Sequence, residues 1–234
     1  MITKHDSICI ALTDDEIKLV MEKARAQLFI SKRDNLRTRH ANIQYDCILR
    51  GYIGEFAITK WINEQGIFFD KANYIADGEN IDVDFLYNGK NVELKTSLIP
   101  DTDFTIENAI ENRDIKLIKR ENEINDLKGD IHLQVFFNQR RMAKDEWLAK
   151  RIVNIEEAEI DELFDKMLAR CYRNSTCFVG WIDRQTLIEN INVLSDKDKT
   201  WSFKDSKRQF WSCKVAKSKK PTELPNFLKS ISNK

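Results

Sequence analysis

The chain has 234 residues, of which 42% are hydrophobic and 32% are charged, with only seven glycines and three prolines. This composition is typical of a packed globular domain that contains helices, and it excludes disordered and fibrous classes. Lys plus Arg equals Asp plus Glu at 38 each, so a nucleic-acid partner would have to be held by local basic patches. No apolar run approaches the roughly 20 residues that cross a bilayer, and residues 1–6 lack a signal-peptide pattern. We therefore expect a cytoplasmic protein that has no membrane segment.

The cysteines and histidines do not form a metal-binding pattern. No two cysteines have C-x-x-C spacing, and the three histidines do not lie at zinc-finger spacing. We expect free thiols rather than a structural zinc site at the five cysteines, which are Cys9, Cys47, Cys171, Cys177 and Cys213.

Two helices are predicted in the first quarter of the chain. Thr13 to Glu16 fits a capping box, and the apolar spacing that follows predicts a helix from about Asp14 to Ile30. A basic connector covers residues 32–40. A second amphipathic helix is predicted from about Asn42 to Asn63, because its large apolar residues fall in one stripe: Tyr45, Leu49, Tyr52 and Phe56.

The hydrophobic period then changes from helical to two. Apolar and polar residues alternate over 81–86 and over 92–95, and Asn88-Gly89 stands between these two runs. Asn-Gly between alternating runs is a strong signal for a β-hairpin with a two-residue turn. The sequence therefore predicts two antiparallel strands here.

The rest of the chain alternates between helical and strand patterns. Helices are predicted over about Ile115–Leu127, Lys144–Ile152 and Glu156–Arg170, and strands over Ile131–Phe137 and Cys177–Ile182. This order favours an α/β fold with a central mixed β-sheet flanked by helices. The late aromatic residues are expected to belong to the core of the final strands: Trp201, Phe210 and Trp211.

The hairpin gives one of its faces an unusual charge pattern. A two-residue turn at Asn88-Gly89 places Asp84 opposite Glu93 and Asp82 opposite Lys95, all on one face. Three interpretations stay open for this face. It can be a solvated surface with a weak ion pair, a site for a divalent cation that prefers carboxylate oxygens, or a carboxylate pair with one raised pKa.

The same residues carry a resemblance to a known family. Asp84 precedes the triplet Glu93-Leu94-Lys95 by nine residues, and the other [DE]-x-K triplets of the chain do not lie on a predicted strand. This arrangement resembles the PD-(D/E)xK signature of the restriction-endonuclease-like nuclease superfamily, with Val83 in place of the proline that many members also lack. Upstream, the segment 51–57 (GYIGEFA) is similar to the GxxGE-type helix of that superfamily, which brings Glu55 toward the same site.

The resemblance spans about residues 42–138 and implies a fold and an activity. The implied fold is a restriction-endonuclease-like α/β core with a mixed sheet. We expect a single nuclease domain over residues 1–234, with its core at about 42–140, an N-terminal helical element at 10–40 and a C-terminal basic and aromatic extension at 171–234. The implied activity is that of a Mg²⁺-dependent DNA endonuclease of the type II restriction class. A Holliday-junction resolvase, a repair or phage-defence nuclease, and a non-cutting nucleic-acid-binding module are the alternatives.

The resemblance also assigns roles to particular residues. It implies that Asp84, Glu93 and the backbone carbonyl of Leu94 bind Mg²⁺, for which Mn²⁺ can substitute. Lys95 would orient the attacking water, and Glu55 would bind a second ion or position the first ion's water. Asp82 is the alternative to Asp84. On the following strand, Gln134 is a possible accessory residue, while His132 is interpreted as an ordinary strand residue.

The expected partner is double-stranded DNA, bound by a homodimer. Three basic groups are candidates for phosphate contacts, although each fits a solvated surface equally well. They are Arg37 and Arg39 in the first connector, Arg140 and Arg141 after the third predicted strand, and Lys204, Lys207 and Arg208 near the C-terminus.

Overall fold

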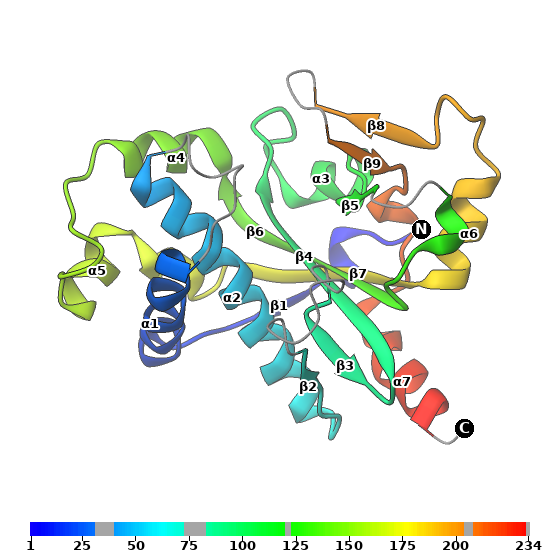
Figure 1. Cartoon of the computed structure of the whole chain (residues 1–234), viewed down its shortest axis with the longest axis horizontal. Coiled ribbons are helices and arrows are strands. Elements are labelled where there is room, and N and C mark those ends of the chain that lie inside the picture. Colours follow the sequence, from blue (N-terminus) through cyan, green and yellow to red (C-terminus); the bar gives the residue numbers. More distant parts are fainter. Residues whose placement is uncertain (31–39, 73–82, 120–122, 204–207, 233–234) are drawn as a thin grey trace.

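A six-stranded mixed sheet forms the centre of the protein (Figure 1). The computed structural model describes residues 1–30, 40–72, 83–119, 123–203 and 208–232. Only β4 and β6 are parallel, and the other neighbouring strands are antiparallel. The strand order is β1 (Ile8–Ile10), β7 (Thr176–Asp183), β6 (Ile131–Arg140), β4 (Lys90–Ile99), β3 (Phe85–Tyr87) and β2 (Asp70–Lys71). The predicted mixed α/β architecture is therefore confirmed.

The first two helices match their predictions closely. Helix α1 spans Asp14–Ile30 and begins at the predicted capping box. Its Thr13 Oγ1 accepts a hydrogen bond from the Glu16 N–H at 3.2 Å, and Glu16 Oε2 accepts one from the Thr13 N–H at 2.8 Å. Helix α2 spans Ala41–Glu64. Each helix therefore starts and ends within about one residue of the position that its apolar spacing indicates.

One face of the main sheet is covered by α1, α2, α4 (Arg141–Ala149) and α5 (Ile160–Lys166). Helix α2 lies close to β4, because a Cβ added at Gly54 would overlap the Cγ2 of Thr96 and touch Leu94. The apolar side chains of β4 that face these helices include Val92, Leu94 and Leu98. The predicted helices at 144–152 and 156–170 exist, although both begin and end at different residues and α5 is much shorter.

The opposite face carries α3 (Ile106–Asn112), α6 (Arg184–Asn192) and a small three-stranded sheet. In this sheet β9 (Gln209–Trp211) pairs with both β5 (Leu117–Ile118) and β8 (Thr200–Ser202). Figure 1 places β8 and β9 beside α6, at the side of the sheet away from α1. Phe210 and Trp211 are buried here, as predicted, and Trp201 stacks on Phe210.

The predicted helix over Ile115–Leu127 is wrong. Leu117 and Ile118 form β5, and the described residues 123–127 contain the short 3₁₀ helix η2 (Ile124–Asp126). Ile115 and Leu117 are both buried at a spacing of two, which is a strand pattern, and the Ile115 N–H donates to the Cys213 carbonyl at 2.8 Å. Pairing with β9 therefore takes the backbone hydrogen bonds that a helix would need.

The remaining elements complete both ends of the chain. The short 3₁₀ helices are η1 (Lys4–Asp6), η3 (Ala169–Tyr172), η4 (Val215–Lys217) and η5 (Pro221–Glu223), and the last helix is α7 (Leu224–Ser232). Strand β7 is an interior strand of the main sheet, between the edge strand β1 and β6, so the sheet uses residues from the first ten to beyond 175. Within the described residues, no helix combines the length and the apolar character needed to cross a bilayer.

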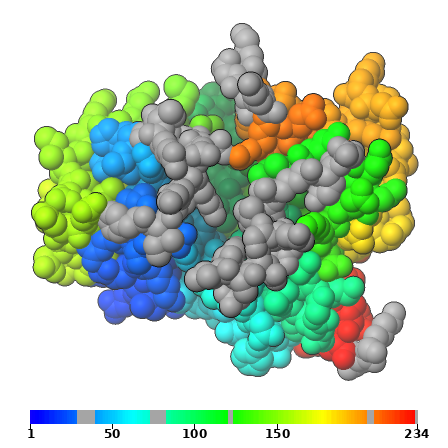
Figure 2. All heavy atoms as spheres, viewed as in Figure 1, coloured from blue at the N-terminus to red at the C-terminus, as the bar shows by residue number. Residues whose placement is uncertain are grey.

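The space-filling view shows how these parts meet at the surface (Figure 2). Helices α1 and α2, in blue, lie on one side, and β8 and β9, in orange, lie on the other. The green residues of the β4–α3 region lie deeper between them, so the visible surface is recessed there.

Candidate active site

The predicted β-hairpin is present with the predicted register. Phe85 pairs with Val92 and Tyr87 pairs with Lys90, so Asn88-Gly89 forms the two-residue turn. Both turn residues have positive φ, 48° at Asn88 and 72° at Gly89, as a type I′ turn requires. The turn therefore fixes which residues of β3 and β4 lie side by side.

Polar side chains of β4 and β6 lie together on one face of the sheet. Val92 and Leu94 face α2, so the intervening Glu93 and the following Lys95 point to the other face of β4. The parallel register aligns Glu93 with His132 and Lys95 with Gln134. The two strands therefore bring Glu93, Lys95, His132 and Gln134 together.

Glu93 is almost completely buried, with 5% of its surface exposed. Its Oε1 forms an ion pair with Lys95, and its Oε2 lies 2.8 Å from His132 Nδ1. Burial opposes ionisation of this carboxyl group, but the positive charge of Lys95 and the contact with His132 outweigh burial and lower the Glu93 pKa to about 2. Glu93 is therefore a carboxylate at neutral pH.

His132 is fully buried and has a close polar neighbour at each ring nitrogen. While Nδ1 faces Glu93, Nε2 lies 3.2 Å from the Gly129 carbonyl oxygen. A Cβ at Gly129 would come within 2.5 Å of His132 Cε1, so this position needs a glycine. The sequence interpretation gave His132 no role. The contact of His132 with Glu93 follows from the parallel register of β4 and β6. Local sequence patterns do not specify this register.

Asp84 lies beside the middle of β4. Its N–H donates to the Val92 carbonyl at 3.0 Å, and its Oδ2 accepts a hydrogen bond from the Leu94 N–H at 2.6 Å. The regular β3–β4 pairing ends at Phe85, one residue before the expected opposition of Asp84 and Glu93. Asp84 therefore lies beside Glu93 and Leu94 of β4, and its carboxylate accepts a hydrogen bond from the Leu94 backbone. Asp82, the alternative ligand, lies outside the described residues.

Glu55 comes from the other side of the sheet. It lies on α2, whose Gly54 packs against the face of β4 that is opposite to Glu93 and Lys95. The Glu55 Oε2 is 3.9 Å from the Nζ of Lys71, which belongs to the edge strand β2. The structure therefore places Glu55 with β2.

Gln134 offers a buried oxygen on the same face as Lys95. Its Nε2 donates to the carbonyl oxygens of Lys95 at 3.1 Å and of Val135 at 3.0 Å. Its Oε1 is buried and has no hydrogen-bond partner among the described residues. Buried polar atoms are rarely left without partners, so this oxygen marks a place where a further polar group fits.

The oxygen atoms gathered at this site are of the kinds that a hard divalent cation prefers as ligands. Mg²⁺ is usually bound by one or two carboxylates plus water, and Asp84 and Glu93 supply two carboxylates, with the Gln134 Oε1 as a further oxygen on this face. Both Glu93 oxygens contact basic side chains. In the described part of the chain, no three His, Cys, Asp or Glu side chains gather closely enough to form a metal-binding cluster.

No protein-family model, curated protein or solved structure matches this chain. Inference about its function therefore rests on its own residues and their geometry.

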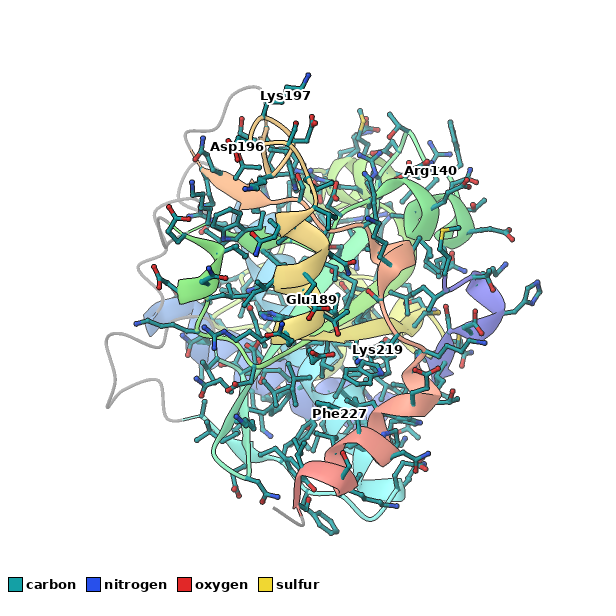
Figure 3. All side chains as sticks on the ribbon, turned by 90° about the vertical axis from the view of Figure 1, so that its right-hand side faces the viewer. Arg140, Glu189, Asp196, Lys197, Lys219 and Phe227 are labelled. Atoms are coloured by element: carbon teal, nitrogen blue, oxygen red, sulfur yellow. The ribbon has the colours of Figure 1, made fainter. Side chains whose placement is uncertain are left out.

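The arginines predicted to contact DNA differ in their ion pairs within the protein. Arg140 Nε lies 3.8 Å from Asp101, Arg141 Nε lies 3.7 Å from Asp145, and Arg208 is exposed. Figure 3 shows Arg140 near the upper edge of the molecule, away from Lys219 and Phe227. The other predicted contacts lie outside the described residues: Arg37, Arg39, Lys204 and Lys207.

Part of the positive charge near the C-terminus is used within the protein. Three of its lysines form ion pairs with acids from other segments, at 3.0, 2.5 and 2.9 Å respectively: Lys214 with Asp114, Lys219 with Asp183, and Lys220 with Asp6. The Lys219 ammonium also lies over the rings of Trp181 and Phe227. These lysines therefore attach the C-terminal segment to three other parts of the chain, one of which is β7 of the main sheet.

Proposed function

We propose that this protein is a Mg²⁺-dependent DNA endonuclease of the PD-(D/E)xK type. One observation carries the proposal: Glu93 and Lys95 lie in direct contact on one face of β4, and Asp84 bonds the residue between them. An acid and a lysine at this spacing, with a second acid from the neighbouring strand, are the groups that the signature requires. The mixed sheet between two layers of helices agrees with the implied fold class.

Asp84 and Glu93, with the Leu94 carbonyl, are the groups that would hold the cation. When bound, Mg²⁺ supplies a Lewis acid and lowers the pKa of a water molecule. The low pKa of Glu93 keeps its carboxylate charged and available at neutral pH. Gln134 Oε1 would add a neutral oxygen on this face, whereas Glu55 lies beside Lys71 of β2 and is not part of this proposed ligand set.

Lys95 would provide positive charge next to the reacting phosphate. Its ammonium group pairs with Glu93 Oε1, so Lys95 would have to leave this oxygen if Glu93 held a cation through it. Displacement from Glu93 would free the ammonium group to orient the attacking water and to stabilise the developing negative charge. His132 stays on Oε2 and would hold the Glu93 carboxylate in place during this exchange.

Double-stranded DNA bound by a homodimer is the proposed substrate arrangement, and a type II restriction enzyme is the proposed class. A junction resolvase or a repair nuclease would use the same site. A nucleic-acid-binding module that does not cut is the second candidate, and a specific observation favours it: both Glu93 oxygens are held by Lys95 and His132. Such a neutralised carboxylate also suits a purely structural role.

Cleavage of supercoiled plasmid DNA with and without Mg²⁺ tests the proposal. We expect nicking or cutting by the wild type with Mg²⁺, and a loss of at least about 100-fold in Lys95→Ala and in Asp84→Asn. Lys90→Ala is the matched control, because Lys90 lies on the same strand and pairs with Asp130 at 3.6 Å, away from Glu93. Circular dichroism checks that each variant folds.

The pattern of products separates the classes of nuclease. Discrete bands from a long linear DNA support a restriction enzyme, whereas preference for branched DNA supports a resolvase. Cleavage that persists in both the Lys95 and the Asp84 variants contradicts the proposed site. DNA binding without any cleavage supports the non-cutting module.

A further inference from the structure

Two strands of the main sheet place a pair of cysteines directly opposite each other. Cys9 pairs with Cys177 in the antiparallel β1–β7 ladder, and their Sγ atoms lie 2.7 Å apart. Cys9 is exposed, whereas Cys177 is buried. The two residues are 168 positions apart in the sequence, so only the folded chain brings them together.

The strand pairing satisfies the distance requirement for a disulfide. Directly opposed residues of an antiparallel pair have Cα atoms about 4.5–5.5 Å apart, and disulfides span Cα distances of about 4.4–6.8 Å. The sulfurs of Cys9 and Cys177 need to approach by only about 0.7 Å to reach a normal S–S bond length. Bond formation therefore needs no rearrangement of β1 or β7.

Two other cysteines have different neighbours. Cys47 Sγ lies 3.0 Å from the Arg50 guanidinium, and Cys171 Sγ lies 3.1 Å from Gln139 Oε1. The sulfur–sulfur contact between Cys9 and Cys177 thus sets this pair apart from Cys47 and Cys171, whose sulfurs contact other side chains.

We propose that Cys9 and Cys177 form a reversible disulfide when the protein meets a low-molecular-weight disulfide such as oxidised glutathione. The Cys9 thiolate attacks one sulfur of this oxidant, which releases one thiol and leaves a mixed disulfide on Cys9. Cys177 then loses its proton to solvent and attacks the Cys9 sulfur, and the second thiol leaves by taking up a proton. The chain loses two electrons, and the small disulfide is reduced to two thiols.

The different environments of the two cysteines set the order of these steps. Burial raises the pKa of Cys177, and the contact with Cys9 raises it further, so Cys177 is a poor first nucleophile. Cys9 is exposed and can meet a soluble oxidant. The resulting bond would join β1, an edge strand, covalently to the interior strand β7. This inference does not depend on nuclease activity.

Peptide mapping of the full chain tests the proposal. The protein is incubated with mixtures of reduced and oxidised glutathione, free thiols are blocked with iodoacetamide, and the chain is digested with trypsin without reduction. We expect peptide 5–18 linked to peptide 174–184, lighter than the two free peptides by two hydrogens. Dithiothreitol should reverse the link, and the link should raise the melting temperature by at least about 4 °C.

Variants separate this bond from non-specific oxidation. Cys9→Ser should abolish both the link and the thermal shift, whereas the triple variant Cys47→Ser, Cys171→Ser, Cys213→Ser should keep both. The proposal is overturned if glutathione stays attached to Cys9, if both thiols remain open to alkylation in oxidised glutathione, or if Cys9 joins a different cysteine.

Discussion

His132 Nδ1 lies 2.8 Å from Glu93 Oε2, across the parallel strands β4 and β6. Both side chains are buried, and the second ring nitrogen of His132 faces the Gly129 carbonyl. A charged carboxylate inside a sheet is stable only when it is paired and hydrogen-bonded. Lys95 supplies the opposite charge for Glu93, and His132 supplies a close polar neighbour, so both residues are expected to stabilise the buried carboxylate.

Replacement of His132 by leucine should destabilise the protein. The substitution leaves one oxygen of a buried carboxylate without a partner, which should lower the free energy of unfolding by about 1–3 kcal/mol. His132→Asn keeps a donor near the Nδ1 position and should cost less. Urea unfolding at pH 7 measures both variants, and an equal loss in the two would contradict a specific contact with Glu93.

Acidification should remove the stability that Glu93 contributes. The Glu93 pKa is about 2 in the folded protein and ordinarily 4.5, so its contribution is complete above about pH 4.5 and disappears as the pH falls toward 2. The advantage of the wild type over Glu93→Gln should therefore shrink by roughly 2 kcal/mol between pH 6 and pH 3. Urea unfolding across this range checks the prediction. A difference that stays constant or grows on acidification would mean that Glu93 is not held as a carboxylate.

Sequence signals that act over a few residues predicted α1 and the hairpin correctly. The predictions that failed depend on contacts between residues that are far apart in the chain. The capping box at Thr13 and the turn at Asn88-Gly89 act within a few residues, so α1 and the hairpin register could be read directly. The contact of Glu93 with His132 depends on a parallel pairing across 39 residues, and no periodicity encodes which strands become neighbours. The helix expected over 115–127 failed for the same reason, because its partner strand lies beyond residue 208.

Substitution by alanine should have opposite effects on stability at Gly51 and Gly54, the two glycines of the GxxGE segment. Among the described residues, a Cβ at Gly51 would meet nothing within 4 Å, so Gly51→Ala should stabilise α2 by about 0.5–1 kcal/mol. At Gly54 the added Cβ would overlap Thr96 Cγ2, so Gly54→Ala should destabilise by about 1–3 kcal/mol. Thermal unfolding of the pair measures the difference. Adding Thr96→Ser to Gly54→Ala should recover part of the loss, and no recovery would place the strain elsewhere.

A second buried charge network should be among the most sensitive points of the fold. Asp46 is fully buried and forms ion pairs with Lys144 at 2.9 Å and with Arg50 at 3.0 Å, and it accepts a hydrogen bond from the Tyr172 hydroxyl at 2.7 Å. Burial opposes ionisation of Asp46, but Lys144 and Arg50 outweigh it and lower the Asp46 pKa.

Asp46→Asn should therefore cost about 3–5 kcal/mol, because it leaves two cations without their counter-charge inside the protein. Glu162→Gln is the matched control, because Glu162 pairs with Lys166 at 2.6 Å on the surface, and it should change stability by less than about 0.5 kcal/mol. Denaturant unfolding compares the two variants. Similar small effects in both would show that the Asp46 network is not needed.

The distance along the chain between β1 and β7 has a consequence for synthesis. Residues 8–10 leave the ribosome early, but the strand to which they pair begins at Thr176. At about 5–20 residues per second, the 168 residues that separate Cys9 from Cys177 take roughly 8–34 s to translate. During this interval the nascent β1 has unpaired backbone groups and can bind other extended chains. Slower translation should thus lengthen the period in which this short segment depends on chaperones.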